Sequence, residues 1–345
     1  MTRRSASWLN FEGKPMLYES IEKTKMILSS IHWPIYWSGE LTGELVSIAL
    51  LLCFVTLSNL ELRFPKLAYT PWQKRLSYQT NISLFVLNSI VITVFSISTL
   101  LAIAERYSGS GLLSYLSTPA LKALVSLLAI DLVLYLWHQA CHRLEFLWLF
   151  HRVHHSDSSM NVSTAFRLHF VEIFATTCLK LLLIVTLGID KMSVLAMETL
   201  ILLCTMFHHT NTSFKYERML GCFMIVPLLH RLHHATERSD HDHNYGTVFS
   251  FWDRLLGTLS LAEPERIGIK NSPPENVLNL LKFGFGWEAP VCINPPNLDL
   301  MIAEAAFYKA EKRNFCPGDE LRDWLEAKSD ILRERVINPQ RNHFG

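Results

Sequence analysis

The sequence is poor in charged residues and lacks the pattern of a disulfide-bonded protein. Only 18% of its 345 residues are charged, and the net charge is +1. The seven cysteines are odd in number and include no CxxC pair, so we expect reduced thiols rather than a disulfide framework. A charge this close to neutral gives no support for binding nucleic acid. We therefore expect no nucleic-acid partner.

Several common cofactor and enzyme motifs are also missing. The sequence has no GxGxxG dinucleotide loop, no CxxCH haem motif and no HExxH zinc-protease motif. Gln139 and Arg152 follow histidines at the places where HExxH would need its glutamate. A redox enzyme without such motifs has to receive its electrons from a separate protein.

Long apolar runs are abundant instead. Half of the residues are hydrophobic and the mean hydropathy is +0.19. Residues 42–61, 82–104 and 119–137 each approach the roughly 20 residues that cross a bilayer as a helix. Residues 170–189 and 192–207 form a further apolar pair, separated by Asp190 and Lys191. The runs predict an all-α integral membrane bundle with about five membrane-embedded helices, although the pair could also be two buried helices of a soluble bundle.

The pattern divides the chain into three parts. We expect a polar or amphipathic segment over 1–40, the membrane and catalytic domain over 41–260, and a soluble, largely helical tail over 261–345. The loop after the first run carries Arg63, Lys66, Lys74 and Arg75, whereas the next loop carries Arg106 alone. The positive-inside rule places the first of these loops in the cytoplasm. The histidines described next then fall on the cytoplasmic face.

Thirteen of the fifteen histidines lie between residues 138 and 243, and most of them form short boxes. The first box is HxxxH (His138, His142), and two HxxHH boxes follow (His151, His154, His155 and His230, His233, His234). Imidazole is a common ligand of zinc, copper, iron and nickel. Residues at i, i+3 and i+4 share a helix face, so we expect each HxxHH box to aim three rings at one point. Eight rings exceed the needs of one tetrahedral zinc and predict a site for two metals.

These boxes and two later motifs resemble a known family. The order HxxxH, HxxHH, HxxHH, followed by Asn244-Tyr245-Gly246 and by WDRLLGT at 252–258, is similar to the fatty acid hydroxylase superfamily over about residues 120–260. That superfamily includes sterol desaturases, sphingolipid hydroxylases and alkylglycerol monooxygenase. The resemblance implies a membrane enzyme that uses two iron ions and O2 to hydroxylate or desaturate a lipid C–H bond. It also implies an external electron donor, which could be a cytochrome, a ferredoxin or a reductase.

The resemblance further implies roles for individual residues. The eight box histidines match the family's implied iron ligands; His209, in the FxHxN-like stretch 207–211, is expected to complete the site, and His169, in the RxHxxE-like stretch 167–172, could add another ligand. Candidates for supporting these ligands by hydrogen bonds are Asp131, Glu172, Asn211, Asn244 and Tyr245. We expect Glu172 to orient His169. His241 and His243 are more typical of a solvated loop.

Asp131 lies inside an apolar run, seven residues before His138 and on the same helix face. An intramembrane carboxylate usually faces the bundle interior and has a role there. We expect it to accept a hydrogen bond from a ligating histidine. A pair with Lys180, or a hydrogen bond with Tyr135 or Ser126, is the alternative.

Two other functions fit parts of the pattern. Histidine alone does not select iron, so a membrane hydrolase or isomerase with two zinc ions is an alternative. A metal transporter or sensor is a weaker one, because transporters hold their ligands near the bilayer midplane whereas these boxes lie at the ends of the runs. Sterol, fatty acyl, sphingoid and ether lipids all remain candidate substrates.

Overall fold

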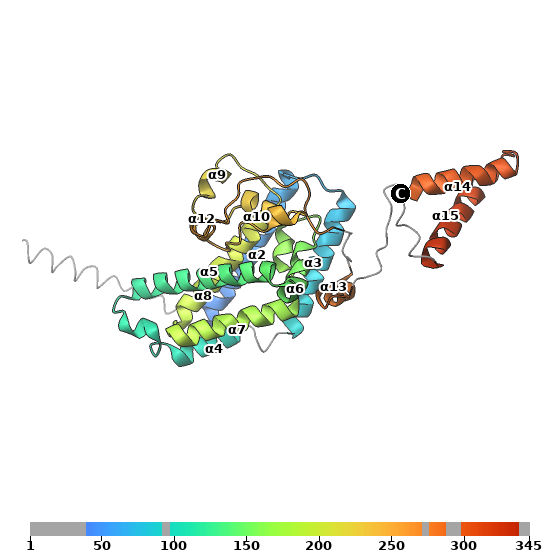
Figure 1. Cartoon of the computed structure of the whole chain (residues 1–345). Helices are drawn as coiled ribbons and strands as arrows, with labels where there is room; N and C mark the ends of the chain where they lie inside the picture. Colours follow the sequence, from blue (N-terminus) through green and yellow to red (C-terminus); the bar gives the residue numbers. More distant parts are fainter. Residues whose placement is uncertain (1–38, 92–96, 271–275, 288–297, 338–345) are drawn as a thin grey trace, which may run out of the picture. The chain divides into compact units, whose positions relative to one another are not determined.

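The computed structural model describes residues 39–91, 97–270, 276–287 and 298–337 (Figure 1). Across these ranges the chain is helical, with two isolated β-bridges and no longer strand. The predicted all-α class is therefore confirmed. The predicted segment 1–40 lies almost wholly outside the described residues. The chain divides into two compact units, Met1–Leu52 and Cys53–Gly345.

Four described helices are long and apolar enough to cross a membrane. They are α2 (Gly39–Arg63, apolar from Gly43), α5 (Pro119–Arg143), α7 (Phe170–Leu187) and α8 (Lys191–His209). Large apolar side chains on them, such as Val55 and Leu182, are exposed. Such exposure is costly in water but favourable against lipid. The protein is therefore an integral membrane protein.

The sequence predicts one membrane-crossing helix over the apolar run 82–104, but the structure differs. The run is divided between α3 (Pro71–Val91) and α4 (Ile97–Tyr107), and residues 92–96 lie outside the described ranges. Buried polar side chains on α3, among them Asn81 and Asn88, bond to the rest of the protein. Hydropathy alone could not reveal that α3 packs against a polar protein interior.

The apolar core lies where α4 packs against α7 and α8, with α5 against the same two helices (Figure 1). Its buried members come from all four helices, from the single turn η2 (Leu112–Tyr115) and, through Ile189, from the turn between α7 and α8. They include Leu100, Ala104, Leu113, Ile130, Leu134, Ile184, Val194 and Met197. This core holds α5, which carries the first histidine box, and α8, which ends at His209.

A short turn joins α7 to α8, as the sequence predicts. Gly188 ends α7 in the left-handed region with φ 70°, which glycine adopts without steric cost. Asp190 begins α8 by accepting a hydrogen bond from the Ser193 amide at 3.0 Å. The backbone of Gly111 lies against this turn so closely that a Cβ there would meet Gly188 N at 2.2 Å.

Short helices continue the chain beyond the spans. They are α6 (Glu145–His155), η3 (Val162–Phe166), α9 (Glu217–Leu220), α10 (Pro227–His233), α11 (Arg238–His241), α12 (Phe251–Leu255) and α13 (Val277–Gly284). The tail contains α14 (Leu298–Lys312) and α15 (Glu320–Ile337), which pack together as a hairpin. Arg313 and Asp323 pair at 2.7 Å across that hairpin.

A buried carboxylate fixes the end of α6 against α3. Asp157 accepts hydrogen bonds from Ser77 and Asn81 of α3 and from Thr164 of η3. Arg167 donates to the Val153 carbonyl at 3.1 Å and to Ser156 Oγ at 3.0 Å. Because buried polar groups need such partners, this network holds α6 in one position.

An ion pair between two spans gives a test of the bundle. Lys180 Nζ of α7 lies 2.8 Å from the Glu198 carboxylate of α8, and both side chains are largely buried. We expect Lys180→Met to lower the free energy of unfolding in detergent by about 3–5 kcal/mol, because it leaves a buried charge unpaired. The double variant Lys180→Met/Glu198→Leu should recover most of that loss.

The exposed pair between Lys191 and Glu105, at 3.1 Å, is the matched control. Lys191→Met should cost less than about 1 kcal/mol. Equal losses in the single and double variants at the buried pair would show that the pairing does not matter.

Candidate metal centre

Nine histidines form two adjacent groups at the ends of α5 and α8 and on α6 and α10. The five-histidine group consists of His138, His142, His151, His155 and His233, and the four-histidine group of His154, His209, His230 and His234. Within each group the candidate ligand atoms all lie within 4.8 Å of one another. The groups adjoin, because the rings of His155 and His234 stack with their centroids 4.5 Å apart. The structure thus brings together all eight box histidines and His209.

Each HxxHH box divides its rings between the two groups. On α6, His151 and His155 join the five-histidine group while His154 joins the other. On α10, His230 and the adjoining His234 join the four-histidine group while His233 joins the first. Residues i and i+4 differ by about 40° around a helix, whereas i+3 and i+4 differ by about 100°. The expectation of three rings aimed at one point was therefore wrong, and two helices can build two sites in common.

Five of the rings donate from Nδ1 to an oxygen of the surrounding protein. The acceptors are the carbonyl of Tyr245 for His138 (2.8 Å), the carboxylate of Glu172 for His151 (2.7 Å), the carbonyl of Arg167 for His154 (3.3 Å), the carbonyl of Thr205 for His209 (2.7 Å) and the carbonyl of His243 for His233 (2.8 Å). A carbonyl oxygen can only accept, so in these rings Nδ1 carries the hydrogen and Nε2 carries the lone pair.

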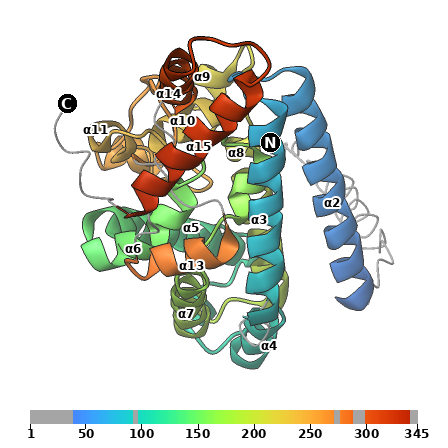
Figure 2. The same ribbon diagram turned by 90° about the vertical axis from the view of Figure 1, so that its right-hand side faces the viewer.

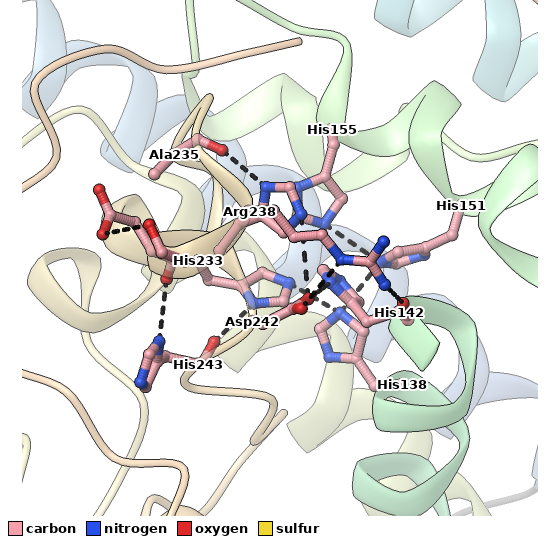
Figure 3. A network of polar contacts seen from close by, with 12 residues as sticks. His138, His142, His151, His155, His233, Ala235, Arg238, Asp242 and His243 are labelled. Atoms are coloured by element: carbon pink, nitrogen blue, oxygen red, sulfur yellow. Dashed lines mark hydrogen bonds and ion pairs between the residues drawn. The ribbon is translucent and has the colours of Figure 1, made fainter. Parts of the chain in front are cut away.

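The Nε2 atoms of these five rings converge, joined by that of His230, whose Nδ1 has no hydrogen-bond partner. In the five-histidine group His138 Nε2 lies 3.0 Å from His151 Nε2 and 2.9 Å from His233 Nε2 (Figure 3). In the other group His209 Nε2 lies 3.1 Å from His154 Nε2 and 3.0 Å from His230 Nε2. Two lone pairs cannot form a hydrogen bond, but both can bind a cation. The donor set therefore fits a metal ion in each group.

The protonation and the hydrogen bonds of these histidines also suit metal binding. Burial, reinforced by the neighbouring imidazoles, lowers the pKa of His154, His155, His230, His233 and His234 well below the ordinary value. Neutral imidazole is the form that binds metal. His142 Nδ1 faces the Asp242 carboxylate at 3.2 Å, while its buried Nε2 has no hydrogen-bond partner (Figure 3).

Glu172 supports a histidine, but a different one from that expected. Its carboxylate, on the first turn of α7, accepts from His151 rather than from His169. His169 lies outside both groups: its Nδ1 accepts from the Val171 amide at 3.2 Å, and its Nε2 donates to the Leu281 carbonyl at 3.3 Å. Because both nitrogens are engaged, the structure does not bring His169 into the centre.

The loop over Asn244–Gly246 supports the centre through its backbone. Asp253 accepts hydrogen bonds from the amides of Tyr245 (2.7 Å) and Gly246 (2.9 Å), which aims the Tyr245 carbonyl at His138. A Cβ at Gly246 would meet the Phe249 carbonyl oxygen at 2.6 Å. Sequence reasoning did not single out Asp253, although its WDRLLGT motif was the available signal.

Asp131 has another role than the one expected from its spacing. Its carboxylate accepts from the amides of Val248 (3.0 Å) and Phe249 (3.2 Å) and from Trp252 Nε1 (2.9 Å). It contacts neither a ligating histidine nor Lys180. Asp131 does face the protein interior, but the loop at Val248, more than a hundred residues later in the chain, occupies that side of the helix.

The two asparagines also act on loops rather than on histidines. Asn211 accepts from the Leu67 amide (2.9 Å) and donates to the Leu67 carbonyl (2.8 Å). Asn244, with φ 58°, donates to the carbonyls of Leu229 and Ser260, both at 2.9 Å. Each one fixes a chain segment that adjoins a ligand helix.

Other histidines lie near the centre without joining the two groups. His208 is buried, with its ring centroid 4.0 Å from that of His230. His241 donates to the Ala235 carbonyl at 3.0 Å and forms a smaller candidate group with His142 and Asp242. The His243 side chain faces the Asp240 carbonyl at 3.3 Å.

A cavity of about 170 Å³ opens from both histidine groups into the space between α5, α7 and α8. Its walls include His138 and His151 of one group and His154, His209 and His230 of the other. They also include the apolar residues Leu134 and Ile201 of the spans and Leu168 just before α7. Thr176 and Thr205 also line it, but their hydroxyls donate to the carbonyls of Glu172 and Ile201 in their own helices. The cavity therefore joins a nitrogen-rich end to a mainly apolar wall.

Two parts of the chain match models of known families. Residues 123–258 match the model of the fatty acid hydroxylase family. This stretch is similar to the fatty acid hydroxylase family, and both histidine groups lie inside the match. Residues 298–333, which contain α14 and much of α15, match a second family that is described only as a protein of unknown function.

Hydroxylases and monooxygenases of several lipids are similar to this chain. An ornithine lipid hydroxylase from Rhizobium tropici is 25% identical, over 87% of this chain and 97% of its own. The human alkylglycerol monooxygenase is 28% identical over 46% of this chain, and human cholesterol 25-hydroxylase is 25% identical over 40%. These two matches cover only 35% and 51% of the relatives' own lengths. No solved structure matches the chain.

The hydrogen bond between Glu172 and His151 makes a direct prediction about metal binding. Glu172→Ala should weaken metal affinity about 10- to 100-fold, because the His151 ring loses the acceptor that fixes its tautomer and orientation. Titration of the metal-free protein with Fe²⁺ or Co²⁺, followed by absorbance, measures this.

Glu145→Gln is the matched control, since Glu145 is an exposed acid on the first turn of α6. It should leave the affinity unchanged. Equal affinities in wild type and Glu172→Ala would contradict the assigned role.

Proposed function

We propose that the protein is a di-iron oxygenase that hydroxylates a C–H bond of a membrane lipid with O2. The single observation that carries the proposal is the shared cavity, in which two groups of metal-competent histidine nitrogens face an apolar space between membrane helices. The relatives named above, which are hydroxylases and monooxygenases of lipids, support oxidation as the chemistry and hydroxylation over desaturation.

Iron is favoured over zinc by the chemistry of the relatives. Imidazole binds both metals well, but zinc has no redox chemistry and cannot activate O2. A pair of iron ions, when bound, would supply O2 activation and hydrogen abstraction. His138, His142, His151, His155 and His233 would hold one ion, and His154, His209, His230 and His234 the other.

The chain's own residues would prepare the centre and the substrate. Glu172 and the carbonyls around the rings keep hydrogen on Nδ1, so that Nε2 stays free for metal. At about 170 Å³ the cavity is smaller than most ligand pockets, so it would take only the reacting segment of a lipid while the rest remains in the bilayer. Its apolar wall would exclude water from that segment.

An electron donor, a membrane face and a substrate class complete the proposed function. Electrons would come from a separate cytochrome, ferredoxin or reductase, since the sequence carries no flavin, nicotinamide or haem motif. The basic residues between the first two apolar runs, Arg63, Lys66, Lys74 and Arg75, support a cytoplasmic position for the centre. The substrate class is a membrane lipid. An ornithine lipid is the first to test, because the ornithine lipid hydroxylase from Rhizobium tropici matches nearly the whole chain.

Metal content and product formation test this function together. We expect the reconstituted protein to hold about two iron ions per chain. When it is incubated with a lipid extract, O2 and a reducing system, we expect a lipid product that is heavier than its substrate by one oxygen atom. His154→Ala removes a ligand of the four-histidine group, so it should lower the iron content and abolish product.

His243→Ala is the control, because the change keeps the backbone carbonyl that accepts from His233. It should retain both iron and turnover. A wild-type protein with a single tightly held iron, or a His154→Ala variant with full turnover, would refute the proposal.

A further inference from the structure

Helix α13 lies outside the hydroxylase match and packs on the helix that carries three of the histidines. Asn276 begins it by accepting from the Leu278 amide at 2.9 Å. Its inner face buries Leu280 and Phe283 against Val153 of α6 and Leu84 of α3. Figure 2 shows α13 in orange beside α6 and α7. One face of this helix is thus firmly attached to the protein.

The opposite face is apolar and exposed. Leu278, Phe285 and Trp287 are 66%, 52% and 65% exposed. Gly286, with φ 81°, turns the chain after α13, so that Trp287 returns to donate its amide hydrogen to the Lys282 carbonyl. Three large apolar side chains exposed together on so short a segment are unusual for a surface in water.

These side chains line an open groove of about 550 Å³ together with Phe170, Leu281 and Lys282. Phe170 is the first residue of the span α7. Phe174, one turn further on, is 43% exposed on the same helix face. The groove is therefore continuous with the surface that α7 presents to lipid.

We propose that α13 and Phe285–Trp287 form a membrane-docking surface, in which lipid at the bilayer interface fills the groove beside Phe170. Tryptophan is enriched at the level of lipid headgroups. Lys282 suits the same position, because its stem covers apolar surface while its ammonium reaches the headgroups. No other charged side chain lines the groove among the residues that the structure describes.

The docking surface is rigidly connected to the histidine groups. Arg152, next to His151, donates to the Phe283 carbonyl at 2.6 Å and lies 3.8 Å over the Phe283 ring. A Cβ at Gly284 would meet the His169 ring at 2.5 Å, which shows how closely α13 packs on the residue that begins α7. His169 thus serves as a packing and capping residue. The depth at which α13 sits in the bilayer would set the depth of the cavity.

Fluorescence of Trp287 in the full-length protein tests this docking. The protein is placed in phosphatidylcholine nanodiscs whose acyl chains carry bromine either near the headgroup or near the chain end. The spectrum of wild type minus that of Trp287→Phe isolates the emission of Trp287. We expect bromine near the headgroup to quench most of that emission, and bromine near the chain end to quench much less.

Two outcomes would overturn the proposal. Emission that lipid bromine leaves unchanged but aqueous acrylamide quenches would place Trp287 in water. Emission that neither agent quenches would show that another protein segment covers the groove. Because the measurement needs neither metal nor substrate, its failure would leave the proposed oxygenase function standing.

A matched pair of substitutions on α13 separates docking from folding. Leu278→Glu places a carboxylate on the exposed face and should reduce the quenching of Trp287 without changing the unfolding temperature in detergent. Leu280→Ala removes a fully buried side chain and should lower that temperature. Unchanged quenching in Leu278→Glu would count against a lipid-filled groove.

Discussion

The metal centre depends on the close approach of nine imidazoles, in which the Nε2 lone pairs of His138, His151 and His233 face one another, as do those of His154 and His209. Nε2 atoms about 3 Å apart cannot satisfy each other by hydrogen bonds. The surrounding carbonyls and the Glu172 carboxylate hold the hydrogens on the far side of the rings, so the protein maintains this arrangement rather than relieving it. A cation bound in each group would supply the interaction that these lone pairs lack.

Much of the surrounding fold serves to fix these rings. Asp157 and Arg167 hold the end of α6, Asp253 shapes the loop that aims the Tyr245 carbonyl, and Asp131 attaches the following segment to α5. None of these charged groups needs to touch a ligand ring. Each is buried and hydrogen-bonded, which makes the loops near the centre as well fixed as the helices.

The sequence predicted which histidines form the centre better than it predicted how they divide between the two groups. Spacing and family motifs identified all nine grouped histidines, and hydropathy identified the four spans, because both signals are local. The division of each HxxHH box between two groups follows from helix geometry but needs the positions of the partner helices. Asp131, His169 and the run 82–104 were misjudged for a related reason: their partners are distant in sequence, namely the amide of Val248 and the carbonyls of Leu281 and Leu168. A contact between residues far apart in sequence leaves no periodic trace.

The most direct measurement of the central claim is an anomalous-scattering map of the iron-loaded protein, recorded on either side of the iron edge. The account predicts two peaks, one bounded by the Nε2 atoms of the five-histidine group and the other by those of the four-histidine group, at nitrogen-to-metal distances of roughly 2.0–2.2 Å. A single peak shared by both groups, or no peak at either, would contradict it.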